Sequence, residues 1–117
     1  MKNLEQIRAK NALEAVKEYK SFKGDGDGDI VKKVPTQIRD NGFLAAMAFA
    51  LDKGKGYEDV FNAIITHLPD VNCSFGLPCN EGVEAFFEKL VEKDSDTLRA
   101  ITAEALAYLN YLRRLAD

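Results

Sequence analysis

Hydrophobic residues recur along the chain at spacings of three and four, the repeat of amphipathic α-helices. No segment is a convincing β-strand. Glycines and prolines divide the pattern into about six segments. The sequence therefore predicts an all-α fold, a compact single-domain bundle of about six helices over residues 1–117.

The first predicted helix covers residues 3–22 and has one apolar stripe, formed by Ala9, Ala12, Leu13, Val16 and Tyr19. On its outer face Lys10, Glu14 and Lys17 lie one turn apart, where opposite charges can pair. We expect these charged residues to form a solvated surface.

The second predicted helix starts at Asp29, a plausible N-cap, and stops at Asn41 and Gly42, which favour a left-handed turn. Pro35 lies inside it, removes one backbone hydrogen bond and disfavours helical geometry at Val34. We expect a kink, or a helix that restarts near Pro35.

A third helix is predicted over residues 43–51, which are nearly all apolar and rich in alanine. Such a run is typical of a short helix that is buried on most sides. We therefore expect it to form the centre of the core, with Phe49 fully buried.

Three further helices follow the glycines at 54 and 56. They are predicted near residues 57–69, 81–92 and 94–116, the last with Asp94 or Ser95 as its cap, and residues 70–80 are expected to form an irregular loop. The expected inward-facing residues are Val60, Phe61, Ile64 and Leu68, then Val83, Phe86, Phe87, Leu90 and Val91, then Leu98, Ile101, Ala105, Leu106, Tyr108, Leu109, Leu112 and Leu115.

Residues 24–29 read GDGDGD and place a carboxylate at every second position. An EF-hand loop that began at Asp25 would have its first three ligands, but Ile30 and Thr36 would replace the turn glycine and the closing glutamate. We therefore favour a flexible acidic linker between two helices over a calcium loop.

Composition limits the chain to an ordinary domain, with 117 residues, 46% hydrophobic and 30% charged. No run of about 18 apolar residues is present, and the N-terminus is charged throughout. We expect a soluble cytoplasmic protein that is not secreted and contacts no membrane. Cys73 and Cys79 are then expected to be reduced thiols, and together with His67 they fall short of the four ligands of a structural zinc site.

The net charge of −3 is unevenly distributed. Residues 1–55 contain 11 Lys and Arg against 8 Asp and Glu, a net charge of +3, whereas residues 56–117 contain 5 against 11, a net charge of −6. Such a distribution suits a protein that contacts a polyanion with one face and another partner with a second face.

No group of residues has the pattern of an active site. His67 has no serine or cysteine placed to use it as a base, and at the end of its helix the dipole and nearby carbonyls would satisfy it. The segment DKGKGY lacks the residues of a phosphate-binding P-loop. The residues thus predict a binding or scaffolding module without a cofactor. The alternative is an enzyme, which would need a bound ligand or metal at His67 and Cys73.

The best candidate for binding is the segment VKKVPTQIRDNGF. Lys32, Lys33 and Arg39 supply cationic donors, and Asn41 with Gly42 offers a turn that a phosphate chain can approach closely. The alternative is that these residues only keep the surface soluble.

At this segment the sequence resembles a known family, the small helical subunit of the type III-B CRISPR effector, the Cmr complex. Three stretches carry the resemblance, in order: RAKNALEAVKEYK, VKKVPTQIRDNGFLAAMAFAL and TLRAITAEALAYLNYLRRLAD. Together they cover a little over half of the chain.

The resemblance implies a small all-α protein without enzymatic activity, which serves antiviral defence inside a ribonucleoprotein. Copies of the chain would stack in a short filament beside other Cmr subunits and help to accommodate the duplex of guide RNA and target RNA. The residues implied as phosphate contacts are Lys32, Lys33, Arg39, Asn41, Arg113 and Arg114. The alternative is a small helical adaptor that binds only proteins, through Glu84, Glu88 and Glu92.

Overall fold

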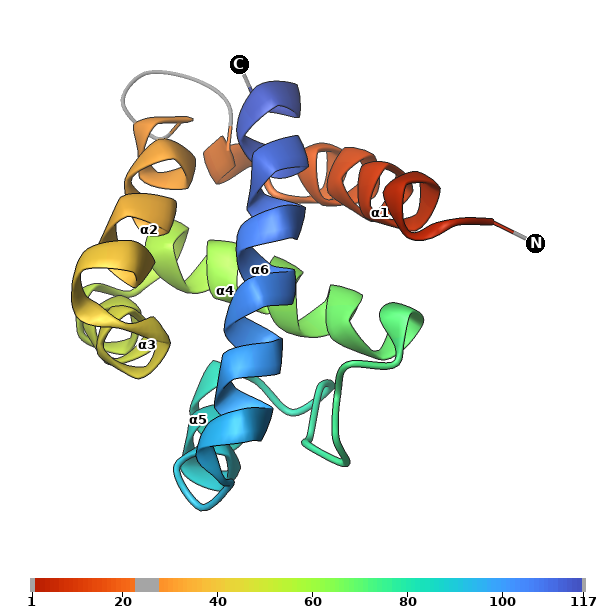
Figure 1. Cartoon of the computed structure of the whole chain (residues 1–117). Helices are drawn as coiled ribbons and strands as arrows, with labels where there is room; N and C mark the ends of the chain where they lie inside the picture. Colours follow the sequence, from red (N-terminus) through yellow and green to blue (C-terminus); the bar gives the residue numbers. More distant parts are fainter. Residues whose placement is uncertain (1, 23–27, 117) are drawn as a thin grey trace.

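Six α-helices and two short 3₁₀ helices make up the structure, a computed structural model that describes residues 2–22 and 28–116 (Figure 1). These described ranges contain no β-strand, so the predicted all-α class is confirmed. The elements are α1 (Leu4–Glu18), η1 (Lys20–Phe22), α2 (Gly28–Asn41), α3 (Phe43–Lys53), α4 (Lys55–His67), η2 (Leu68–Val71), α5 (Val83–Leu90) and α6 (Ser95–Leu115).

The longest helix, α6, spans the molecule at the front of the view in Figure 1, and α1, α2 and α4 pack against it. Helix α3 packs on α2 and α4, and α5 packs on α3 and α4. The apolar faces of all six helices meet in one core. The largest side chains buried there are Tyr108, Phe22, Phe43, Phe61, Phe86 and Met47.

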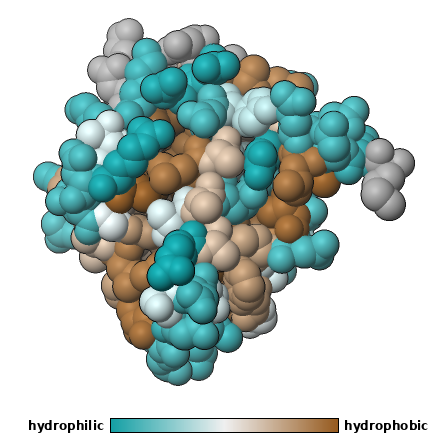
Figure 2. Space-filling view, in the orientation of Figure 1, coloured by the Kyte–Doolittle hydropathy of each residue, from teal (hydrophilic) through white to brown (hydrophobic). Residues whose placement is uncertain are grey.

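On the face in view, hydrophilic side chains cover much of the surface and hydrophobic side chains show in patches among them (Figure 2). No helix in residues 2–22 and 28–116 is long and apolar enough to cross a membrane. On the outer face of α1, Lys10 Nζ lies 3.8 Å from Glu14 Oε1, so the predicted charge pair forms.

Side-chain caps fix the starts of the first and last helices. Asn3 accepts a hydrogen bond from the backbone N–H of Gln6, and the Gln6 side chain accepts one from the Asn3 backbone, which is a capping box. At α6, Asp94 accepts from the Thr97 N–H at 2.8 Å. The predicted cap at Asp94 is therefore confirmed.

Of the two outcomes expected at Pro35, the restart is wrong, because α2 continues through the proline from Gly28 to Asn41, and the kink stays a prediction. Val31, Val34 and Ile38 are all buried on the inner face of α2. Burial of this apolar face outweighs the single backbone hydrogen bond that proline removes. The helix also starts before Asp29, which lies in its first turn and is not its N-cap.

The predicted stop of α2 is confirmed at Gly42, which adopts φ 95° and donates its N–H to the Ile38 carbonyl at 2.9 Å. Residues 24–27 of the GDGDGD segment, including most of the predicted linker, lie outside the described residues. Its last two residues belong to α2.

The expectation that α3 is buried on most sides, with Phe49 at the centre of the core, is also wrong. Phe43, Ala46, Met47 and Ala50 are buried, but the Phe49 side chain is 37% exposed. Only one side of α3 faces its neighbours, and the many alanines concealed this polarity in the sequence. Helix α3 is therefore buried on one side only.

Smaller differences occur near helix ends and edges. Leu13, Val91 and Leu115 were expected inside, yet they are 45%, 51% and 37% exposed. Val91 follows the end of α5, which covers only Val83–Leu90, and α4 already begins at Lys55. The irregular loop is present as expected, although its first residues form η2.

Candidate nucleic-acid interface

The outer face of α2 carries the basic residues that the sequence singled out. Lys32, Lys33, Arg39 and Asn41 are all exposed. The three basic residues point away from the buried Val31, Val34 and Ile38, and Asn41 lies nearer the edge of that buried face. Long cationic side chains on an exposed helix face can reach phosphate oxygens without moving the backbone.

Arg39 lies next to Asp40 in the sequence and could pair with it or with another carboxylate of the helices. Within the described part of the chain neither Arg39 nor Lys33 takes part in an ion pair or a side-chain hydrogen bond. Their charged groups are thus available to an external anion.

A shallow hollow of about 430 Å³ lies on the same helix, lined by Lys32, Lys33, Thr36 and Gln37. The lysine stems can form an apolar wall while their ammonium groups remain at its rim. The hollow therefore suits a polymeric ligand that has both apolar and anionic groups.

Arg113 and Arg114 are exposed in the last turn of α6, at the other end of the chain. Arg114 lines a hollow with Glu5, Asn110 and Tyr111, beside the start of α1. No predicted site residue of α2 lines that hollow, so the structure does not gather all six residues into one cavity.

Helix α5 and the turn after it carry the acidic row. Glu84, Glu88 and Glu92 are exposed, as the sequence predicted. Two of them border a hollow of about 560 Å³, whose lining is Gly76, Leu77, Pro78, Glu81, Ala85, Glu88, Lys89, Glu92 and Lys93. This acidic surface belongs to different elements from the basic face of α2.

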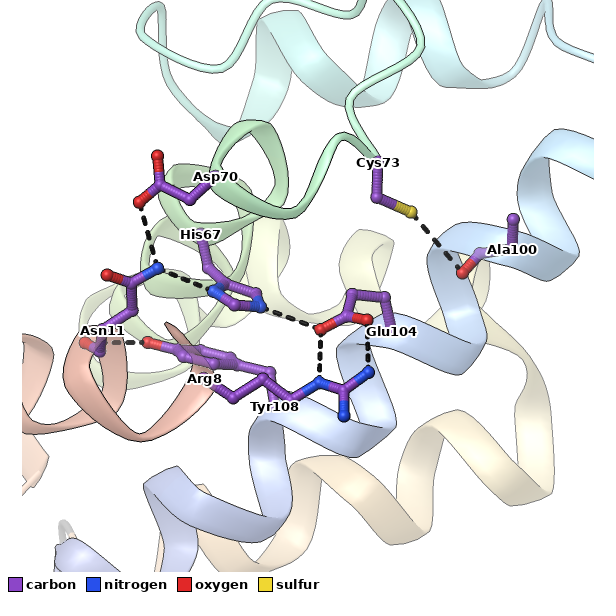
Figure 3. Close-up of polar contacts among 8 residues, drawn as sticks. All are labelled: Arg8, Asn11, His67, Asp70, Cys73, Ala100, Glu104 and Tyr108. Atoms are coloured by element: carbon purple, nitrogen blue, oxygen red, sulfur yellow. Dashed lines mark hydrogen bonds and ion pairs between the residues drawn. The ribbon is translucent and has the colours of Figure 1, made fainter. Parts of the chain in front are cut away.

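His67, the only histidine of the chain, is buried and belongs to a polar network between α1, α4 and α6 (Figure 3). Its Nε2 lies 2.9 Å from Glu104 Oε2, and its Nδ1 lies 2.8 Å from Asn11 Nδ2. Because an amide nitrogen donates and a carboxylate accepts, the neutral ring carries its proton on Nε2. Arg8 donates to both oxygens of Glu104, at 2.8 and 2.7 Å.

Further contacts complete this network. The His67 ring stacks on Tyr108 with centroids 4.3 Å apart, and Asn11 also donates to Asp70 at 3.1 Å. Thus α1, α6 and the end of α4 are joined by side chains. The expectation that helix-end carbonyls satisfy His67 is wrong, because side chains do so.

The environment keeps His67 neutral and Glu104 ionised. Burial lowers the pKa of His67, although the hydrogen bond to Glu104 opposes it. Burial would raise the pKa of Glu104, but the hydrogen bonds from Arg8 and His67 outweigh it, and the pKa is lowered. The pKa of Arg8 is raised, chiefly by its hydrogen bond to Glu104.

Neither cysteine is arranged as a nucleophile. Cys73 Sγ donates to the Ala100 carbonyl at 3.7 Å, and Cys79 Sγ donates to the Leu77 carbonyl at 3.5 Å. Burial raises the pKa of both thiols, which disfavours the reactive thiolate. Nowhere in residues 2–22 and 28–116 do three His, Cys, Asp or Glu side chains gather in a group that could hold a metal ion.

Sequence reasoning missed the network of Arg8, Asn11, His67 and Glu104. The Arg8–Glu104 contact joins residues 96 positions apart, and no local spacing announces such a pair. In the sequence, nothing distinguishes Arg8 or Glu104 from the other charged residues of their helices. Only the packing of α1 against α6 brings them together.

These features define a class: a small all-helical protein with a basic face on one helix, an acidic face on another and a buried polar network that acts as a structural link. A profile of one family, described as CRISPR-associated protein (Cas_Cmr5), matches residues 4–117. The chain belongs to this family, the small helical subunit of the type III-B Cmr complex. Searches of curated proteins and of solved structures gave no significant match.

Proposed function

We propose that this chain is a non-catalytic subunit that stacks with its own copies beside other Cmr subunits in the cytoplasm and helps to accommodate the duplex of guide RNA and target RNA. The observation that carries the RNA contact is the exposed basic face of α2, where Arg39 and Lys33 have no ion-pair partner within the described residues. Asn41, beside the turn at Gly42, adds a polar side chain at the end of this face.

Phosphate contact explains these residues better than base recognition does. Lysine and arginine at the surface neutralise phosphates, release counterions and carry no sequence preference. Sequence is instead supplied by pairing between guide and target in RNA-guided complexes. Arg113 and Arg114 would add phosphate contacts at the end of α6.

The net charge of −3 shapes how RNA binding would occur. An isolated acidic chain with few phosphate contacts binds RNA poorly, because long-range repulsion offsets local attraction. Assembly removes this disadvantage, since neighbouring subunits position the basic face and contribute charge of their own. RNA contact is therefore a property of the complex.

A double variant, Lys33→Glu with Arg39→Glu, tests the proposal in the reconstituted complex. It should weaken target-RNA affinity without altering sequence preference and flatten the dependence of affinity on salt, because fewer counterions are released. Melting curves provide the control that the variant folds, and size-exclusion chromatography that it enters the complex. An unchanged affinity and salt slope would contradict the proposal.

The second candidate is an adaptor that binds only proteins, and the exposed row Glu84, Glu88 and Glu92 favours it. Charge reversal at Glu84 and Glu88 would then release the chain from the complex, while the α2 double variant would leave the electrophoretic shift with RNA unchanged. The two candidates thus give opposite results with the same pair of variants.

A further inference from the structure

A second hollow lies between α2 and α3, next to the one that the lysines line. It measures about 410 Å³ and is lined by Gln37, Asn41, Ala45, Ala46 and Phe49, which we call the α2–α3 groove. Gln37 also lines the lysine hollow, so the two share a wall. Lys33, Gln37 and Asn41 lie one helical turn apart, which places them in a row along α2.

The groove contains a buried acceptor without a partner. The Oε1 atom of Gln37 is buried and makes no hydrogen bond within the described part of the chain. Most buried polar atoms in folded proteins are paired, so an orphaned oxygen at a groove wall needs an explanation. A bound ligand would supply the missing donor if the Gln37 side chain turned its oxygen toward the groove.

The groove also presents an aromatic ring beside a cation. Phe49 is 37% exposed, and its ring meets Tyr57 edge to face, with centroids 5.2 Å apart and planes at 88°. Lys53 Nζ lies 5.7 Å from the centre of the Phe49 ring. These contacts hold the ring in one orientation and place a positive charge next to it.

We infer that the α2–α3 groove receives an unstacked nucleobase of the bound RNA, an inference that rests on the proposed RNA contact of α2. The flat face of a base can stack on the face of the Phe49 ring that Lys53 does not cover. Its exocyclic amino group can donate to Gln37 Oε1 once that side chain turns toward the groove. Phosphates on either side of that base would meet Lys33 and Lys53. Each unusual feature of the groove then has a role.

A protein side chain fits the groove less well. Its apolar part consists of two alanines and Phe49, the amides of Gln37 and Asn41 border it, and Lys53 lies over the Phe49 ring. The centres of protein interfaces are broader in their apolar area and poor in charged residues. A lysine over a small aromatic surface, with Lys33 lining the adjoining hollow, complements a nucleotide, which has negative charge next to a flat base.

The test compares Phe49→Ala with Phe75→Ala in the reconstituted complex. Phe75 is a matched control, because it is 43% exposed and lies in the loop before α5. Phe49→Ala should weaken target-RNA affinity about fivefold to a hundredfold, the loss expected for one stacked base. The salt slope should stay unchanged, since stacking releases no counterion. Phe75→Ala should bind as the parent does.

Two further variants separate stacking from apolar packing. Phe49→Trp should keep the affinity, whereas Phe49→Leu should lose it as Phe49→Ala does, because leucine fills space without an aromatic face. If Phe49→Leu binds RNA normally while Phe49→Ala does not, the groove holds an apolar protein group and the inference is overturned.

Other outcomes are equally decisive. If Phe49→Ala folds but fails to enter the complex, the groove is a protein interface and the inference is wrong. If it enters and binds RNA with unchanged affinity, no base occupies the groove. In that case a loss of affinity in the Lys33→Glu, Arg39→Glu variant still supports the phosphate contact, so the two proposals fail separately.

Discussion

His67 illustrates, at the scale of single residues, how a structural role can be predictable from the sequence while the partners that provide it are not. The sequence shows a lone histidine six residues from a cysteine. In the structure both ring nitrogens are occupied by Asn11 and Glu104, and Cys73 bonds to a backbone carbonyl elsewhere. The position of His67 at the end of α4 was predictable, but its partners on α1 and α6 were not, because they depend on long-range packing.

The network predicts how stability depends on pH. The folded pKa of His67 is lowered from 6.5, so below about pH 6.5 the unfolded chain binds the proton more readily than the folded chain. The free energy of unfolding should therefore fall as pH decreases from 6.5, by up to about 1.4 kcal/mol per pH unit, the limit for one proton. Urea titrations at several pH values measure this slope.

His67→Gln is the control for that slope, because the chain has no other histidine. The variant should lose the dependence between pH 6.5 and 5, whereas the loss below about pH 4.5 that comes from Glu104 should persist. A parent chain whose unfolding midpoint stays flat from pH 7 to pH 5 would contradict the assignment of a neutral, buried His67.

At the scale of elements, the helices were predictable wherever hydrophobic spacing and caps agreed. Helix α6 combined a long apolar stripe with the Asp94 cap, and α2 ended at Gly42 as expected. The two failures have a common cause. At Pro35 and in α3, tertiary packing decided the outcome, and neither proline propensity nor an alanine-rich run reports which side of a helix meets its neighbours.

The corrected position of α3 changes the expected cost of truncating its side chains. Met47 is fully buried, so Met47→Ala should lower the free energy of unfolding by about 2 to 5 kcal/mol. Phe49→Ala should cost only about 1 kcal/mol, mainly its contact with Tyr57. Chemical denaturation of both variants measures the order; a larger loss for Phe49 would show that it belongs to the core after all.

A second prediction at this scale concerns Gly42, the single residue between α2 and α3. Gly42 has φ 95° and ψ 159°, a conformation that only glycine adopts easily, and an added Cβ would meet nothing within 4 Å. Gly42→Ala should therefore cost about 1 to 3 kcal/mol through backbone strain alone. Far-UV circular dichroism during thermal unfolding checks this, and an unchanged melting temperature would mean that the α2–α3 turn differs from the one described.

For the whole molecule, the fold separates two kinds of surface that the charge count suggested only in outline. The basic residues of α2 are exposed on one element, and the glutamates of α5 are exposed on another. The sequence predicted that these charged residues are exposed, because they lie at positions that interrupt the hydrophobic pattern of their helices. It could not predict the α2–α3 groove, since Gln37 and Phe49 meet there only through helix packing.

The central claim is that the basic face of α2 contacts RNA inside the assembled complex, and lysine acetylation with and without target RNA tests it most directly. Lys33 on α2 and Lys89 and Lys93 on the acidic side are all exposed, so each should react with the reagent in the free chain. Target RNA should protect Lys33 in the complex and leave the modification of Lys89 and Lys93 unchanged. If Lys33 reacts equally fast in the complex with and without RNA, and as fast as in the free chain, the basic face of α2 does not contact RNA.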